Sequence, residues 1–231
     1  MLKSATSPAT PRFPPDEEER LLEQIPLIAA WLAYFALHSL LASHRAKRFA
    51  QHHFAALFPR YRLFFNLVAL AALLPALMLI WRQPGEMLWQ WRGLGQWLMN
   101  LLALAGVAGF LYSTRYYDGA TFLGLRANQD GHIGSADEPL VISPLHRFVR
   151  HPWYFFGLLL IWTRDMNSAW LITCLLVTLY FLIGSRLEEN KLIAEYGDGY
   201  AEYRRRVGGI IPLPWKILSA SEARDIMRQP A

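Results

Sequence analysis

Long apolar stretches separated by short polar and basic segments dominate the pattern of the chain. Three of them, at 25–43, 63–81 and 94–112, approach the length at which a helix crosses a bilayer core of about 30 Å. Apolar and polar residues do not alternate with a period of two, as they would in a membrane β-barrel. The pattern therefore predicts membrane-spanning helices, which satisfy their own backbone hydrogen bonds in lipid.

Two shorter apolar stretches follow in the second half of the chain, at 152–163 and 168–184, with a polar turn at 164–167 between them. As helices they would measure about 18 Å and about 25 Å, so the first is too short for a full crossing. We interpret them as a helical hairpin, whose first arm could be extended outside the membrane by 145–151. The predicted fold class is all-α, a polytopic membrane protein with about five transmembrane helices.

Basic residues are distributed unequally between the two sides that five spans would create. The 44–62 loop, the 113–151 loop and the C-terminal tail hold 17 of the 23 lysines and arginines. The positive-inside rule then places the C-terminus in the cytoplasm and the N-terminus outside. The net charge is +5, but the basic residues lie beside apolar stretches. We therefore expect membrane lipids as partners and no nucleic acid.

The two ends of the chain and its single cysteine further restrict the domain organisation and the kinds of site that the chain can contain. Residues 1–23 contain four prolines and an acidic run, and predict a flexible tail and no signal peptide. Three transmembrane helices are expected over 24–113, a hairpin and a cytoplasmic helix over 114–214, and a tail over 215–231. Cys174 lies in an apolar stretch, which excludes a disulfide framework and a cysteine-rich zinc site and predicts a buried thiol.

One histidine falls inside a predicted span. Ionisable side chains are uncommon at membrane depth and often functional there, so His38 stands out. It could be a neutral histidine bonded to a neighbouring helix, or a haem ligand, although no second histidine lies at membrane depth. No histidine or cysteine spacing indicates zinc, so no metal site is predicted.

The segment 138–154 is polar where a simple membrane anchor would not need it. Arg150, His151 and Pro152 directly precede an apolar helix, and proline suits the first turn of a helix. The helix start carries partial positive charge and binds carboxylate or phosphate groups. The alternative is a basic cap at the membrane interface, with arginines that reach toward the headgroups.

The segment 186–203 combines acidic and aromatic residues directly after the last span. It holds Glu188 and Glu189, and its tyrosines recur at helical spacing, although Gly197 and Gly199 should interrupt the helix. An amphipathic interfacial helix is the alternative interpretation. Because the two polar segments flank one hairpin, we expect them to meet on one membrane face. Together they would form a cytoplasmic C-terminal pocket for a charged ligand.

Three blocks of these segments resemble the isoprenylcysteine carboxyl methyltransferase and phospholipid methyltransferase superfamily. They are Arg150-His-Pro-Trp-Tyr-Phe-Phe-Gly157, the pair Glu188-Glu189, and Tyr196-Gly-Asp-Gly-Tyr200-Ala-Glu-Tyr203 with Val207 and Pro212. The resemblance covers about residues 110–214. The N-terminal half, together with Tyr117-Asp118 and Phe122-Leu-Gly-Leu-Arg126, is similar to bacterial branches. These branches are methanethiol S-methyltransferases and membrane proteins called NnrU.

The resemblance implies S-adenosylmethionine as methyl donor and a bacterial inner (cell) membrane as location. The family's cofactor-binding positions correspond here to Glu138, Pro139, Leu140, Val141, His146, His151, Pro152, Trp153 and Tyr154. The substrate-facing glutamate corresponds to Glu188. The family's companion arginine lies four residues earlier, where this chain has Gly184, and Arg186 is nearby. We predict Glu188, Arg186 and Arg150 as catalytic residues.

The expected function is therefore an integral membrane methyltransferase acting on a small or lipid-like acceptor, either a thiol or a prenylcysteine-like carboxylate. Methyl transfer depends on positioning and water exclusion, and a thiol acceptor needs a base or a cationic field. His146, Arg150 and Glu188 could provide it, and the ring of Tyr154 could face the sulfonium. Two alternatives stay open: a non-catalytic NnrU-like protein supporting respiration or denitrification, and a sterol-reductase-type enzyme using NADPH. The chain has no Gly-rich dinucleotide motif after a strand, which excludes a soluble Rossmann-type methyltransferase.

Overall fold

The computed structural model describes residues 17–116, 118–126 and 140–228. In this part of the chain four helices are long and apolar enough to cross a membrane. They are α1 (Glu17–Ala42), α3 (Tyr61–Arg82), α4 (Gly93–Ser113) and α7 (Ser168–Arg206). A fifth apolar helix, α6 (Pro152–Trp162), has 11 residues and is too short for a full crossing. The protein is an all-α polytopic membrane protein, as predicted.

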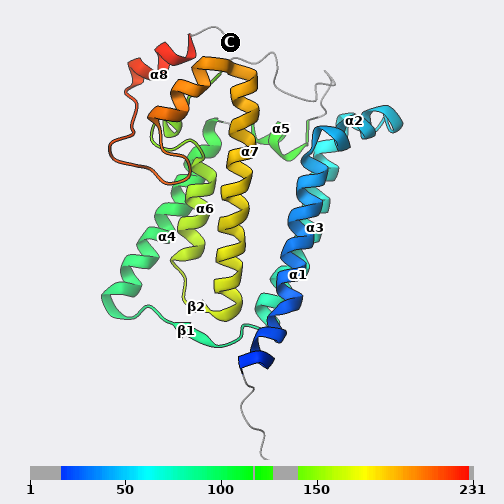
Figure 1. The fold of residues 1–231 in the computed structure, drawn as a ribbon, viewed down its shortest axis with the longest axis vertical. Helices are drawn as coiled ribbons and strands as arrows, with labels where there is room; N and C mark the ends of the chain where they lie inside the picture. The colour runs from blue at the N-terminus through cyan, green and yellow to red at the C-terminus, as the bar shows by residue number, and fades with distance from the viewer. Residues whose placement is uncertain (1–16, 117, 127–139, 229–231) are drawn as a thin grey trace, which may run out of the picture.

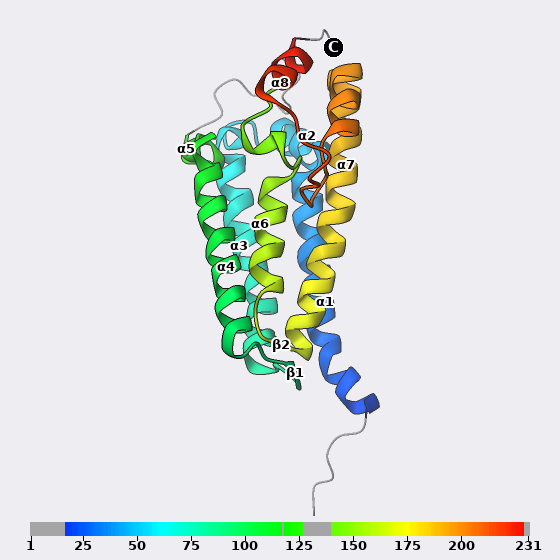
Figure 2. The ribbon, with the colours of Figure 1, turned by 90° about the vertical axis from the view of Figure 1, so that its left-hand side faces the viewer.

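Four of the apolar helices pack as two pairs, and α7 joins the pairs. Helix α1 packs on α3, α4 packs on α6, and α7 contacts both α1 and α6 (Figures 1 and 2). Many of their large apolar side chains are exposed, as expected for helices in lipid. Examples from α3 and α4 are Leu67, Leu70, Leu101 and Leu104, each about 60% exposed.

Short elements cap the two ends of the bundle. At one end β1 (Met87–Trp89) pairs antiparallel with β2 (Met166–Asn167). The opposite end carries α2 (His44–His53), α5 (Gly119–Leu123) and α8 (Ala220–Met227), with 3₁₀ turns at Phe58–Arg60, Thr114–Tyr116 and Leu145–Arg147. Figure 1 shows α2, α5 and α8 together at one end and β1 and β2 at the other. The segments predicted to share the basic side of the membrane therefore do lie at one end.

Polar side chains within the bundle are paired across helices. The indole of Trp31 on α1 donates to the hydroxyl of Thr173 on α7 at 3.0 Å. Of the two interpretations of His38, the structure supports a bond to a neighbouring helix, because its Nδ1 lies 2.8 Å from the Tyr180 hydroxyl of α7. Such bonds are needed because an unsatisfied polar group is costly in a lipid environment. Cys174 is fully buried, as predicted.

Three expectations about element boundaries need correction. Helix α1 begins at Glu17, seven residues before the predicted start of the membrane region at 24. The segment 145–151 does not extend the first arm of the hairpin, because it forms only a 3₁₀ turn and α6 begins at Pro152. The second arm runs past 184 to Arg206, so α7 has 39 residues; its part before the kink at Gly197, 168–196, is about 44 Å long and already extends beyond a bilayer core.

The projecting part of α7 folds back through a kink and forms a small core of its own. Gly197 has φ 55° and ψ −133°, a conformation that favours glycine, and it interrupts the helix as predicted. Beyond it, Tyr200 and Tyr203 are buried against α8 and the following loop. The full cluster consists of Ile142, Tyr200, Tyr203, Val207, Leu218, Ala223 and Ile226. These tyrosines are therefore core residues of the end that carries the polar motifs.

Close packing of α4 on α6 depends on two glycines of α4. A Cβ atom at Gly109 would lie 2.3 Å from the ring of Phe156, and one at Gly106 would lie 3.2 Å from the Phe156 carbonyl oxygen. We expect Gly109→Ala to force the Phe156 ring aside and to destabilise the protein by about 1–3 kcal/mol. Thermal unfolding in detergent measures this as a lower melting temperature.

Gly95→Ala is the matched control for this prediction. Gly95 lies on the same helix, but a Cβ atom there would meet nothing closer than Trp91 at 3.8 Å. We expect the control to keep or slightly raise the melting temperature, because alanine favours the helix. Equal melting temperatures for Gly109→Ala and the wild type would show that α4 and α6 are not packed this closely.

Candidate functional site

The side chain of Glu189 joins the two polar segments. It lies on α7, is only 3% exposed, and has charged partners at both carboxylate oxygens. Its Oε1 lies 2.9 Å from Nε of Arg150 and 2.9 Å from Nε2 of His151. Its Oε2 lies 3.1 Å from Nε of Arg204. The predicted meeting of the Arg-His-Pro turn with the glutamate pair is therefore confirmed.

The backbone on either side of Arg150 is held by the chain that follows α7. Val149 forms a parallel bridge with Gly208, and the amide nitrogens of Arg150 and His151 donate to the carbonyl oxygens of Gly208 (2.8 Å) and Gly209 (3.0 Å). The Nη1 atom of Arg150 also donates to the carbonyl oxygens of Arg204, near the end of α7, and of Val207, which directly follows α7. The guanidinium thus satisfies carbonyls that the end of α7 leaves free.

The hydrogen bond to Glu189 also sets the tautomer of His151. A carboxylate can only accept, so Nε2 of His151 carries the proton. The opposite ring nitrogen, Nδ1, lies 3.6 Å from the Glu188 carboxylate. His151 is buried, whereas the Glu188 side chain is 53% exposed. The site therefore combines a buried, neutralised carboxylate with an exposed carboxylate beside it.

Aromatic rings line the membrane side of this pair of carboxylates. The Tyr154 ring is nearly parallel to the His151 ring (7°, centroids 5.2 Å apart) and to the Phe181 ring (10°, 4.4 Å). Its hydroxyl lies near the Glu188 carboxylate and interacts with it electrostatically. Because two rings stack on Tyr154, we revise its expected role: it presents its hydroxyl to the site, and not its face to a sulfonium.

His146 lies on the 3₁₀ turn before this site and is held on both sides. Its Nδ1 is 2.7 Å from the Ser143 hydroxyl, and its carbonyl oxygen accepts a hydrogen bond of 2.7 Å from the Tyr203 hydroxyl. Burial, and then the nearby charge of His151, lower the pKa of His146 to about 4. The imidazole is therefore neutral at physiological pH.

This lowered pKa predicts a pH-dependent stability. The unfolded chain protonates His146 near its usual pKa of about 6.5, whereas the folded protein does not, so the unfolded state binds more protons between these values. The free energy of unfolding should then fall by up to about 2 kcal/mol between pH 7 and pH 5. We expect His146→Gln to show a smaller drop in melting temperature over this range than the wild type. The same drop in both proteins would contradict a buried, neutral His146.

The other predicted cofactor residues take different positions. Glu138 and Pro139 lie outside the described residues. Leu140 packs on the core cluster of α8, whereas Val141 is 71% exposed. Pro152 is buried and is the first residue of α6, as its role at a helix start requires.

Trp153 lies on a different side of α6 from Tyr154. Its ring contacts Phe110 of α4 (5.2 Å between centroids) and Phe122 of α5 (4.8 Å). Tyr154 instead faces α7, through Phe181. Within the motif, Trp153 therefore contacts α4 and α5, whereas Tyr154 contacts α7.

Of the three residues predicted as catalytic, Arg150 and Glu188 come together and Arg186 does not. Arg186 is exposed on α7 and, two residues before Glu188, points about 200° away from it around the helix. Among the described residues no hydrogen bond or ion pair connects it with His151 or Glu188. A role for Arg186 in this cluster is therefore not supported.

Sequence reasoning missed two parts of the site. The sequence predicted Glu189 only as the second member of a glutamate pair, and it predicted no role for Arg204. The run Arg204-Arg205-Arg206 directly before a buried Val-Gly-Gly segment was the available signal, because arginines beside buried carbonyls often serve as internal donors.

Fold and site together define a polytopic helical membrane protein that has the motifs of isoprenylcysteine carboxyl methyltransferase-like proteins in one cluster. The chain is 30% identical to a methanethiol S-methyltransferase of Crocosphaera subtropica over 203 residues. This aligned region covers 84% of this chain and 77% of that protein. It therefore belongs to the methanethiol S-methyltransferase family, in the bacterial branch of this superfamily.

Other relatives match over shorter regions. Methanethiol S-methyltransferase 2 of Bradyrhizobium diazoefficiens is 33% identical over 135 residues, which are 57% of this chain and 52% of that protein. The methanethiol S-methyltransferase of Pseudomonas deceptionensis is 39% identical over 80 residues, 34% of this chain and 29% of that protein. The chain thus spans about half or less of these two relatives. No family model and no solved structure matches the chain.

Proposed function

We propose that this protein is a membrane methyltransferase that transfers a methyl group from S-adenosylmethionine to a small thiol. The observation that carries the proposal is the exposed Glu188 carboxylate beside the buried Arg150–Glu189–His151 cluster. We further propose that the end bearing α8 faces the cytoplasm of a bacterial inner membrane, since most basic residues lie in segments at that end. Relatives named methanethiol S-methyltransferase support a thiol acceptor.

The residues present fit the chemistry of this methyl donor. S-adenosylmethionine carries an ammonium, a sulfonium and a carboxylate. Glu188 is half exposed and has no arginine or lysine ion pair among the described residues, so its charge is available for a cationic group. The start of α6 beside His151 and the 40% exposed Arg204 provide positive potential for the carboxylate.

S-adenosylmethionine would supply an activated methyl group for in-line displacement. The protein would contribute mainly orientation and water exclusion, which provide much of the catalysis in such transfers. In this arrangement Glu189, held by Arg150 and Arg204, fixes the His151 ring. Tyr154 would in turn hold Glu188 in place. The aromatic wall of Tyr154 and Phe181 would keep water from the membrane side of the site.

The test is methyl transfer by the purified full-length protein in lipid vesicles. We would supply methyl-labelled S-adenosylmethionine with methanethiol, with a prenylcysteine analogue, or with no acceptor. We expect labelled dimethyl sulfide in the headspace only with methanethiol. Glu188→Gln serves as the variant with a damaged site, and we expect it to form little product.

Each of the other possible outcomes would favour a different function for the protein. Methylation of the prenylcysteine carboxylate alone would show that the acceptor is not a small thiol. No transfer together with NADPH binding would favour a reductase. No transfer and no binding of either ligand would favour a non-catalytic NnrU-like role and would overturn the proposal.

A further inference from the structure

His38 is the ionisable side chain at membrane depth that the proposed site does not yet use. It lies four residues before the end of α1 and is partly buried. Its ring contacts the rings of Phe65 on α3 (5.0 Å between centroids) and Tyr34 on α1 (5.8 Å). No ion pair involves His38 within the described ranges. An ionisable group in such apolar surroundings is costly, and in membrane proteins it commonly marks a functional site.

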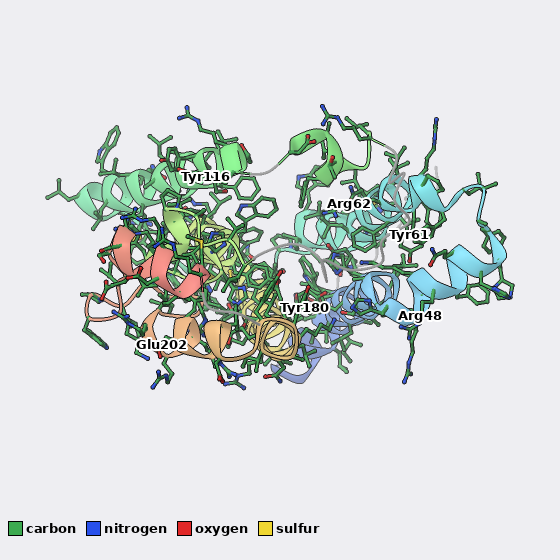
Figure 3. All side chains as sticks on the ribbon, turned by 90° about the horizontal axis from the view of Figure 1, so that it is seen from above. Arg48, Tyr61, Arg62, Tyr116, Tyr180 and Glu202 are labelled. Carbon is green, nitrogen blue, oxygen red and sulfur yellow. The ribbon has the colours of Figure 1, made fainter. Side chains whose placement is uncertain are left out.

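A short chain of contacts connects His38 with the candidate site. Its partner, Tyr180, directly precedes Phe181 on α7, and the Phe181 ring stacks on Tyr154 at 4.4 Å. Tyr154 in turn reaches Glu188. Figure 3 shows Tyr180 on the side of α7 that faces α1. Side-chain contacts through Tyr180 and Phe181 thus connect His38 with the membrane side of the site, from which a small apolar thiol would arrive.

The Tyr180 hydroxyl can set the tautomer of His38. This hydroxyl lies 2.8 Å from Nδ1 of His38 and 3.1 Å from the Ser39 hydroxyl. A hydroxyl has one proton to donate. If Tyr180 donates to Ser39, it accepts from Nδ1–H of His38, and Nε2 of His38 is left with a free lone pair. This arrangement is the one that a general base requires.

We propose that His38 is the general base that deprotonates the thiol acceptor, with Tyr180 as its positioning residue; this rests on the proposed function. The acceptor's S–H bond breaks and its proton moves to Nε2 of His38, while the electron pair stays on sulfur. This sulfur then bonds to the methyl carbon, as the carbon–sulfonium bond of the donor breaks and leaves its pair on the donor sulfur. The proton later leaves His38 to solvent, so atoms and charge balance.

The other candidate bases fit this step less well. Arg150 already donates to Glu189 and to two carbonyls, and an arginine cannot take up a proton. His146 lies on the 3₁₀ turn before the site, where its Nδ1 contacts the Ser143 hydroxyl and its carbonyl oxygen accepts from the Tyr203 hydroxyl. Glu188 is the residue whose charge we assign to the methyl donor.

The experiment compares His38→Gln and Tyr180→Phe with the wild type in vesicles, using two acceptors. One is methanethiol, which is largely protonated at neutral pH, and the other is thiophenol, a more acidic thiol that is largely ionised. For methanethiol we expect His38→Gln to lower kcat/KM by about 10²–10³-fold, typical for loss of a general base. For thiophenol the loss should be less than about tenfold, because no proton needs removal. Tyr180→Phe should show a smaller loss with the same dependence on acceptor.

Binding and a control variant separate this role from a structural one. S-adenosylmethionine affinity, measured by calorimetry, should stay within about twofold of wild type in His38→Gln. His52→Ala, an exposed histidine on α2, should leave all values unchanged. Equal losses for both acceptors, lost cofactor binding, or wild-type rates would each overturn the proposal. A wild-type protein that transfers no methyl group would instead overturn the proposed function itself.

Discussion

Replacing Glu189 by glutamine is expected to lower the stability of the protein more than any other single change at the site. The carboxylate is buried, accepts hydrogen bonds from Arg150 and His151, and forms an ion pair with Arg204. Removing one partner of a buried ion pair leaves an uncompensated charge and typically costs about 3–5 kcal/mol. Because Arg204 is partly exposed, we expect the lower end of this range, measured as a reduced melting temperature in detergent.

The neighbouring glutamate provides the control for this prediction. Glu188→Gln changes the same group one residue earlier on α7, where the side chain is 53% exposed. Exposed ion pairs contribute about 0–1 kcal/mol, so the melting temperature should change little. A melting temperature equally insensitive to both substitutions would show that the Arg150–Glu189 cluster does not hold the site together.

The second large effect concerns binding of S-adenosylmethionine. We expect Glu188→Gln to weaken its affinity by about 10–100-fold, because a charge-assisted hydrogen bond contributes about 1.5–3 kcal/mol. Tyr154→Phe removes the hydroxyl that holds Glu188 but keeps the ring stacked between His151 and Phe181, so it should weaken binding less. Calorimetric titration of the purified variants measures both effects.

A variant outside the cluster shows whether the loss is specific. Asp198→Asn also removes a carboxylate from α7, but on the exposed segment beyond the kink at Gly197. We expect its affinity for S-adenosylmethionine to equal that of the wild type. Similar losses in Asp198→Asn and Glu188→Gln would mean that overall charge, and not the position of Glu188, governs binding.

The membrane-spanning part of the fold could be predicted from the sequence because its signal is local. The stretches 63–81 and 94–112 correspond to α3 and α4 within a few residues, and 152–163 corresponds to α6; the stretch 25–43 matches the end of α1 but not its start at Glu17. Helices in lipid must satisfy their own backbone, so length and hydropathy nearly determine them. The contact between the Arg-His-Pro turn and the glutamate pair also followed from a local argument, since a hairpin joins them.

The C-terminal region could not be predicted in the same way, because it depends on contacts between distant segments. The 145–151 segment pairs with Gly208 and Gly209 through backbone bonds, which a helix there would preclude. The central role of Glu189 depends on Arg204, 15 residues further along the chain and beyond the kink at Gly197. Nothing in the local pattern distinguishes this buried glutamate from its exposed neighbour Glu188.

The most direct test of the account is a calorimetric titration of the wild-type protein with S-adenosylmethionine, with NADPH as the competing ligand. We expect saturable binding of one S-adenosylmethionine per chain, weakened in Glu188→Gln, and no binding of NADPH. Absence of S-adenosylmethionine binding by folded protein, or binding that Glu188→Gln leaves unchanged, would contradict it.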